Sequence, residues 1–137
     1  MITSPRAVDR LAVFLAETAF ETIPTTVIAR AADCVLDVFG AAAAGRASEA
    51  TRAYENVMAR TMSDGSSKIW FSGKKSSEIG AATVNAMAAT ALDIDDGHRK
   101  AAGHPGVAVV VAAVATAEAI ETTVQAFLAS VVLLNVV

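Results

Sequence analysis

The sequence predicts an all-α protein of about six helices with one short extended segment. Its 137 residues can form one domain with a substantial core, but not two. Hydrophobic residues make up 54% of the chain and aromatic residues only 5%. This composition, rich in alanine and valine, indicates closely packed helices that are buried on most sides. Apolar residues also recur every three or four positions, which is the spacing of one helix face.

Two helices are expected before residue 46. Ser4 and Pro5 can open the first, which ends near Thr18. Its apolar face would carry Val8, Leu11 and Leu15, with Ala12 and Phe14 beside them. Pro24 fits the first turn of the second helix, and Gly45 marks its end. Cys34 lies in the apolar pattern of this helix and is expected to be a small core residue.

The third helix and the extended segment follow. Ser48 can cap a helix from Glu49 to about Met62. Its inward face is expected to carry Ala50, Ala53 and Val57. The turn residues SDGSS end it, and KIWFSG then predicts a brief strand or extended segment near Lys68–Ser72. Trp70 and Phe71 are expected to cover the helix layer, and stacking on a substrate is the alternative.

Three further helices complete the expected fold. The fourth runs from an N-cap at Ser76 to about Leu92. The fifth runs from Pro105 to about Ile120 and is nearly apolar throughout, so we expect it to be central. Thr122 or Thr123 can cap the sixth, which has no stop signal. We therefore expect the sequence to end within this helix rather than at a natural helix end.

Composition excludes several classes of partner and location. The net charge of -3, with no basic stripe, predicts no binding to nucleic acid. The longest uncharged apolar run, residues 106–117, is shorter than the roughly 20 residues of a membrane span. A membrane hairpin that includes the apolar end of the chain is a minor alternative. With one cysteine and no secretory signal, the protein is expected to be cytoplasmic. GKKSS lacks the first glycine of a phosphate-binding loop.

Charged residues gather in one segment, residues 85–106, between apolar helical runs. This segment contains Asp93, Asp95, Asp96, His98, Arg99, Lys100 and His104. Acids, imidazoles and cations at the end of a helix bring proton donors, proton acceptors and anion-binding groups together. That arrangement suits a small acidic substrate. The alternative is a loop whose charges simply face water.

A metal site is not expected in this segment. A calcium-binding loop needs glycine at its sixth position and an acid at its twelfth. Counted from Asp93, this chain has Gly97 at the fifth position and His104 at the twelfth. Zinc sites more often show two closely spaced histidines or cysteines on one helix face. We therefore expect neither a metal nor another cofactor.

The segment also resembles a known active-site signature. The order VNAMAATALDIDDGH, a short gap, HPG and an Ala/Val-rich helix ending in AEA resembles that of the MmgE/PrpD family. LAVFLAETAFETIPTTVIARAADCVLDVFGAAAAGRASEA resembles the opening helices of the family, and KIWFSGKKSSEIGAATVNA resembles the segment before the site. The family contains 2-methylcitrate dehydratases, cis-aconitate decarboxylases and related enzymes. The resemblance implies that residues 1–137 are the N-terminal portion of an incomplete MmgE/PrpD-like helical domain.

The resemblance also implies residue roles. Asp93 matches the first acid of the D-x-D-D motif of the family, and His104 matches the histidine of its H-P element. These two are expected to be catalytic, moving a proton at a carbon next to a carboxylate while water or carbon dioxide leaves, without a metal. The residues expected to contact a small polycarboxylate substrate are Asp96, Gly97, His98, Arg99 and Lys100. Asp95 and Asp96 can instead orient the loop, and Arg99 and Lys100 can be simple exposed cations.

Several departures from the family pattern bear on activity. Gly97 stands where many relatives have threonine, Thr90 where many have histidine, and Ala86 where glycine is usual. Further basic catalytic residues of the family come from chain that is absent here, so we expect no activity from this chain alone. It should form a homodimer or bind a chain that supplies the missing part. Two alternatives stay open: a non-catalytic helical module that self-associates or binds a partner, and an isomerase or epimerase on the same scaffold.

Overall fold

The computed structural model describes residues 6–100 and 102–135. Its α-helices in these ranges are α1 (Ala7–Glu17), α2 (Thr25–Gly45), α3 (Glu49–Thr61), α4 (Glu78–Thr90), α5 (Pro105–Ala119) and α6 (Val124–Leu134). A short 3-10 helix, η1 (Phe20–Thr22), precedes α2, and strands β1 (Ser67–Ile69) and β2 (Lys74–Ser76) lie between α3 and α4. The predicted all-α class is confirmed. No helix in the described ranges combines the length and hydropathy that a membrane span requires.

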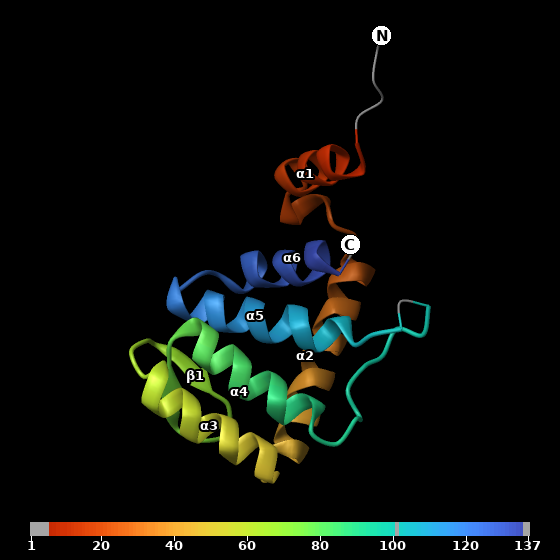
Figure 1. Ribbon diagram of the computed structural model, residues 1–137. Helices are drawn as coiled ribbons and strands as arrows, with labels where there is room; N and C mark the ends of the chain where they lie inside the picture. Colours follow the sequence, from red (N-terminus) through yellow and green to blue (C-terminus); the bar gives the residue numbers. More distant parts are fainter. Residues whose placement is uncertain (1–5, 101, 136–137) are drawn as a thin grey trace.

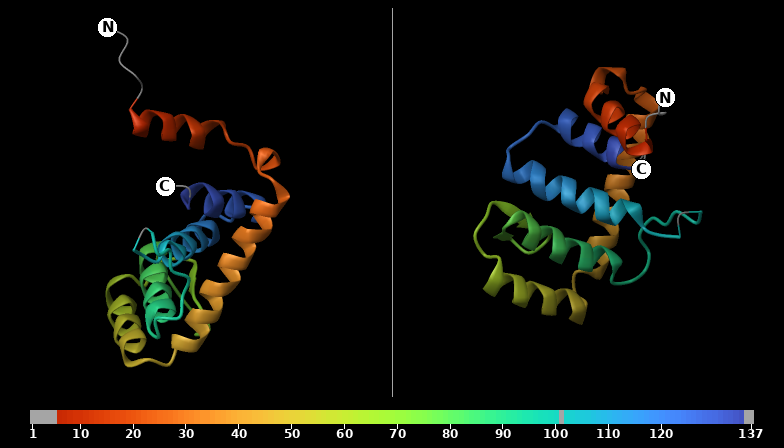
Figure 2. Two further views of the ribbon diagram at one scale, coloured as in Figure 1. Left: turned by 90° about the vertical axis from the view of Figure 1, so that its right-hand side faces the viewer. Right: turned by 45° about the horizontal axis from the view of Figure 1, so that its top comes forward.

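Four of the helices form one layer, and helix α2 crosses this layer. Helices α3, α4, α5 and α6 lie side by side in that order, and α2 runs across the back of the layer (Figures 1 and 2). Helix α4 packs against α2, α3 and α5, and α5 packs against α4 and α6. The nearly apolar α5 therefore lies within the layer, as its sequence predicts.

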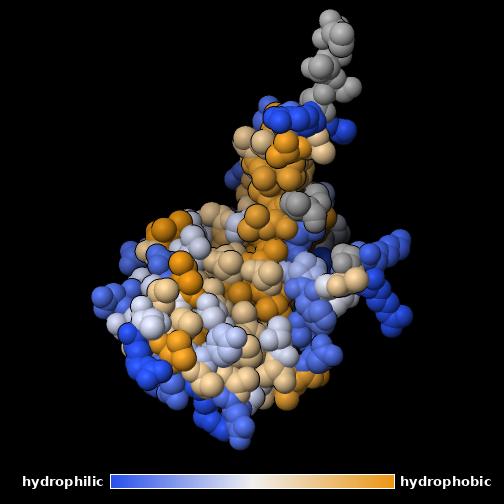
Figure 3. All heavy atoms as spheres, in the orientation of Figure 1, coloured by the Kyte–Doolittle hydropathy of each residue, from blue (hydrophilic) through white to orange (hydrophobic). Residues whose placement is uncertain are grey.

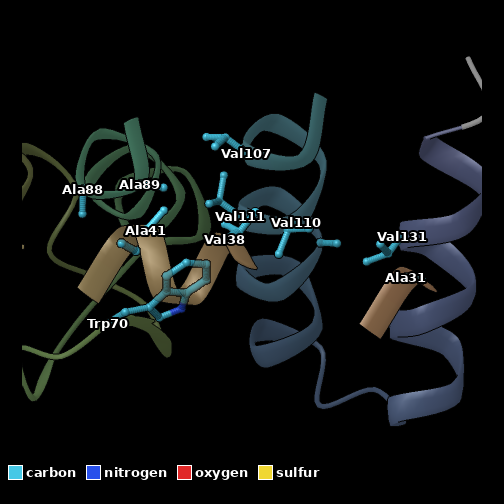
Figure 4. Packing of buried hydrophobic residues seen from close by; sticks show 12 residues of the cluster. Ala31, Val38, Ala41, Trp70, Ala88, Ala89, Val107, Val110, Val111 and Val131 are labelled. Carbon is cyan, nitrogen blue, oxygen red and sulfur yellow. The ribbon is translucent and has the colours of Figure 1, made fainter. Parts of the chain in front are cut away.

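Small apolar side chains fill the space between α2 and the layer. Val38, Val110 and Val131 are fully buried, and alanines of α2 and α4 belong to the same cluster (Figure 4). Trp70 closes the core from the side, and its ring stacks on Phe39 with centroids 4.1 Å apart. Trp70 thus covers the helix layer as expected, whereas Phe71 is 59% exposed and reaches the layer only through an edge contact with Phe39.

Helix α1 departs from the expected packing. None of its residues is buried, although the periodicity of Val8, Leu11 and Leu15 predicts a core-facing stripe. The helix stands apart from the layer, joined to it through η1 (Figures 1 and 2). An amphipathic pattern indicates that a face is suited to burial, but not which surface covers it.

The inward face of α3 is also different from the prediction. Ala50, Ala53 and Val57 are exposed, and the buried residues of the helix are Thr51 and Glu55. The hydroxyl of Thr51 donates to the carbonyl of Gly45 at 3.1 Å. Glu55 forms ion pairs with Arg46 and Lys74. These polar groups face inward because their partners lie there, which an apolar periodicity cannot reveal.

The extended segment is a hairpin, and the N-cap of α4 is one residue later than predicted. Strands β1 and β2 are antiparallel, with Ser67 opposite Ser76. Ser76 therefore belongs to β2, and its hydroxyl donates to the carbonyl of Met62. The next residue, Ser77, caps α4 by accepting the N–H of Gly80 at 3.2 Å. Two adjacent serines fit the cap equally well by sequence, and the pairing of the strands decides between them.

Asn85 joins the hairpin to α4, and its removal should be costly. The side chain is buried; its Oδ1 accepts the N–H of Trp70 at 2.9 Å and its Nδ2 donates to the carbonyl of Lys68 at 3.0 Å. Asn85→Ala leaves both backbone groups unpaired beside a cavity, so we expect a loss of about 3 kcal/mol in the free energy of unfolding. Urea unfolding checks this value. The control, Asn56→Ala at an exposed position of α3, should change it by less than about 0.5 kcal/mol.

Glu55 should make the fold sensitive to acid. Burial by itself would raise the pKa of Glu55, but the hydrogen bonds and charges of Lys74 and Arg46 outweigh it, and the pKa lies below its ordinary value. A carboxyl with a lower pKa in the folded state stabilises the fold above its unfolded-state pKa of about 4.3. The stabilisation by ionised Glu55 is lost as the pH falls through the pKa of this carboxyl in the folded state.

The same argument predicts the behaviour of Glu55→Gln. The variant should be less stable than the parent protein at pH 7, and the difference should shrink as the pH is lowered below about 4. Urea unfolding at several pH values measures it. Glu49→Gln, an exposed residue of the same helix, should show little difference at any pH. A constant deficit in Glu55→Gln would mean that the carboxylate charge is not what stabilises the fold.

Candidate active site

The predicted site lies in the loop between α4 and α5. The described residues of this loop, 91–100 and 102–104, project from the helix layer (Figure 1). The N–H of His98 donates to the carbonyl of Gly103 at 2.9 Å and closes the outer part of the loop. Asp93, close after α4, has a φ of +54°, which is uncommon for a residue other than glycine. Such a conformation persists where the surroundings hold it, and it often marks a functional position.

The imidazole of His104 lies between two carboxylates. Its Nδ1 is 2.9 Å from Oδ2 of Asp95, and its Nε2 is 3.9 Å from Oδ1 of Asp93. The two acids differ in environment, since the side chain of Asp95 is 1% exposed and that of Asp93 is 90% exposed. His104 itself is 42% exposed. The ring is thus anchored on its buried side and reachable at Nε2.

The buried carboxylate sets the chemistry of the ring. A carboxylate that accepts from Nδ1–H fixes both the tautomer and the orientation of an imidazole, leaving Nε2 with a free lone pair. The other oxygen of Asp95, Oδ1, is buried and finds no hydrogen-bond partner within the described ranges. A buried oxygen without a partner costs free energy, so the contact with His104 is the main compensation for placing Asp95 there.

The same three residues also offer possible metal ligands. One atom each from Asp93, Asp95 and His104 lies within 4.8 Å of the others. However, the two carboxylates contact opposite nitrogens of one ring. The closest contact in this cluster is the one of 2.9 Å between Asp95 and His104, which orients the imidazole.

The remaining predicted site residues divide into two groups. Gly97 lies beside the imidazole, since a Cβ added to it would be 3.7 Å from Cε1 of His104. The backbone N–H of Asp96 donates to Oδ2 of Asp37 at 3.1 Å and ties the loop to α2. By contrast, His98, Arg99 and Lys100 are exposed in the projecting part of the loop. The geometry thus brings Asp93, Gly97 and His104 together.

Two contacts of the site were not predicted from the sequence. Asp95 was expected only to orient the loop, and its contact with His104 depends on a loop path that has no periodicity. The contact of Asp37 on α2 with the backbone of Asp96 was not predicted either. A polar residue whose partner is 59 positions away gives no local signal.

Comparison with known families gives one match. The family model described as the MmgE/PrpD N-terminal domain matches residues 9–133, nearly the whole chain. Comparison with curated proteins and with solved structures finds no match. The match includes the loop, both carboxylates and the imidazole described above.

Proposed function

Because the chain belongs to the MmgE/PrpD family through its match to the N-terminal domain, we propose that it carries the imidazole and carboxylate part of a lyase site. The proposed reaction removes water or carbon dioxide from a small polycarboxylate, such as 2-methylcitrate or cis-aconitate. One observation carries the proposal: His104 is held by the buried Asp95, and its Nε2 faces the exposed Asp93.

The proposed role of His104 is proton transfer at carbon. With Nδ1–H directed to Asp95, Nε2 can take a proton from the carbon next to a carboxylate or return one to it. Asp93 lies within 3.9 Å of the same nitrogen and can assist, because it is reachable by a substrate. The geometry supports both catalytic assignments, with Asp95 as the residue that positions the imidazole.

Abstraction of such a proton builds negative charge, which the site must stabilise. Helix α5 begins immediately after His104 with no side chain capping its first N–H groups. The N-terminus of a helix attracts anions, so it is suited to a substrate carboxylate beside the imidazole. Arg99 and Lys100 are additional cations of the loop. We propose that further basic groups come from another part of the polypeptide or from a partner chain.

The proposal is tested on the complete natural polypeptide that contains these residues. Dehydration of 2-methylcitrate and decarboxylation of cis-aconitate are measured first with the unaltered protein. If the unaltered protein turns over neither compound, the proposed substrates are wrong. Turnover of either allows the role of Asp95 to be examined.

Asp95→Asn should reduce kcat by about a hundredfold and leave KM within a few-fold. An amide can offer a donor to Nδ1, which favours the wrong tautomer of His104, as in serine hydrolases whose orienting aspartate is replaced. The matched control is Asp64→Asn in the exposed turn before β1, which should retain full activity. An unchanged kcat in Asp95→Asn would show that the buried carboxylate does not orient a catalytic imidazole.

A further inference from the structure

The hairpin of β1 and β2 lines a pocket that the proposed lyase reaction does not use. The pocket has a volume of about 570 Å³, which is within the range of small-molecule sites. Helix α4 follows β2 and leads to the loop of the candidate active site, and its 13 residues span about 20 Å. The hairpin and that loop lie at opposite ends of the helix layer (Figures 1 and 2). The pocket is therefore separate from the candidate active site.

Aromatic rings gather at this pocket, although aromatic residues make up only 5% of the chain. Trp70 stacks on Phe39, and the ring of Phe71 meets Phe39 edge-on, with centroids 6.5 Å apart. Trp70 is buried, whereas Phe71 is 59% exposed. Hydrophobic and hydrophilic residues lie side by side on the face of this end of the layer that Figure 3 shows. The exposed ring of Phe71 offers a surface on which a flat ring can stack.

The backbone of Phe71 has a conformation that a phenylalanine disfavours. Its φ is +58°, in the left-handed region that bulky residues rarely adopt. Glycine adopts this region without strain, as Gly73 does in the same turn with a φ of +73°. The turn therefore does not favour a phenylalanine, and an exposed ring adds little to the core. Strained residues cluster at sites that bind ligands, and a ligand stacked on this ring would account for both observations.

Lysines on the outer face of the hairpin make the pocket positive. The register places Lys68 of β1 directly opposite Lys75 of β2, and both line the pocket. Like charges in this position destabilise a strand pair. Lys68 is compensated by Glu118, with Nζ 3.2 Å from Oε1, whereas Lys75 forms no ion pair with any residue that the structure describes. An anionic group beside Lys75 would remove the repulsion.

Glu118 adds a hydrogen-bond acceptor to the same pocket. Its side chain is 21% exposed, and its Oε2 accepts the N–H of Lys68 at 2.6 Å. Carboxylates at nucleotide sites accept hydrogen bonds from ribose hydroxyls. A nucleoside monophosphate combines the three groups that the pocket suits: a flat ring for Phe71, hydroxyls for Glu118 and one phosphate for Lys75.

We propose that the pocket beside the hairpin binds a nucleoside monophosphate, with its base stacked on Phe71 and its phosphate beside Lys75. The proposal uses none of the residues of the candidate active site, so it does not depend on the lyase activity. A single nucleotide needs few cations, and the net charge of -3, which disfavours nucleic acid, does not oppose it.

Isothermal titration calorimetry of the complete natural polypeptide with AMP is the first test. AMP should bind at least about tenfold more tightly than adenosine, which lacks the phosphate. It should also bind at least about tenfold more tightly than ribose 5-phosphate, which lacks the base. Absence of AMP binding would overturn the proposal, and so would equal affinities for AMP and either of the two fragments.

Two variants locate the bound nucleotide. Lys75→Glu should weaken AMP binding at least about tenfold, because it replaces the phosphate partner by a like charge. It also puts opposite charges in register with Lys68, so it should not lower the urea midpoint of unfolding. Phe71→Gly should weaken binding about tenfold without lowering the midpoint, since glycine tolerates a φ of +58°. Phe71→Tyr keeps a ring and should keep the affinity.

Two controls separate this pocket from general charge and from the lyase site. Arg10→Glu, at an exposed position of α1, changes the net charge as Lys75→Glu does and should leave AMP binding unchanged. Asp95→Asn should also leave it unchanged. Equal weakening in Arg10→Glu and Lys75→Glu would show that AMP responds only to net charge. Weakening in Asp95→Asn but not in Lys75→Glu would place AMP at the lyase site, and either result would overturn the proposal.

Discussion

His104→Gln in the complete polypeptide is expected to reduce turnover by about a hundredfold or more while the fold remains intact. Glutamine retains a polar group beside the buried Asp95 but has no nitrogen that can accept a proton from carbon. The side chain of His104 is 42% exposed, so the exchange leaves little space unfilled. Steady-state kinetics gives the loss of turnover, and urea unfolding checks the fold.

Asp93→Asn should have a comparable effect if both residues move protons, again with the fold intact. Its side chain is 90% exposed and contributes little to packing. If Asp93 and His104 act as one unit, the double variant should be hardly slower than the slower single variant. Asp64→Asn serves as the control for the loss of one exposed carboxylate. Unchanged turnover in either single variant would remove that residue from the proposed mechanism.

The site illustrates what a sequence can and cannot reveal. The segment containing Asp93 and His104 stands out because charged and imidazole side chains interrupt apolar helical runs, and the family match includes it. The contact of Asp95 with His104 was not evident, since two acids only two residues apart have the same local chemistry. The structure separates them by burial, with one at 1% and the other at 90% exposure. Burial in a loop depends on the path of the chain, which periodicity does not encode.

Some features of the fold were likewise predictable from the sequence, and others were not. Helix positions were predictable because caps and apolar spacing are local, and all six helices lie close to their expected ranges. The inward face of α3 was not predictable, because Thr51 and Glu55 are buried with polar partners outside this helix. The strand pairing that moves the cap of α4 from Ser76 to Ser77 is likewise a contact between segments. Helix α1 shows a third case, an amphipathic helix in which no residue is buried within the described part of the chain.

Two identical substitutions in α2 should have opposite effects on stability. A Cβ added at Gly45 would lie 2.0 Å from the carbonyl oxygen of Ala88 and 2.9 Å from Cβ of Ala91. The oxygen belongs to the backbone of α4 and cannot rotate away, so α2 and α4 must separate. We expect Gly45→Ala to lower the free energy of unfolding by about 3 kcal/mol. Because α4 leads directly into the loop of the site, the same shift should displace Asp93.

Gly40→Ala is the matched control within the same helix. Nothing lies within 4 Å of a Cβ added there, and the residue is exposed. Alanine is the better helix former, so Gly40→Ala should raise the free energy of unfolding by about 0.5–1 kcal/mol. Urea unfolding of the two variants measures the difference. Equal effects would mean that α2 and α4 do not approach as closely at Gly45 as the structure shows, and that helix propensity alone governs both positions.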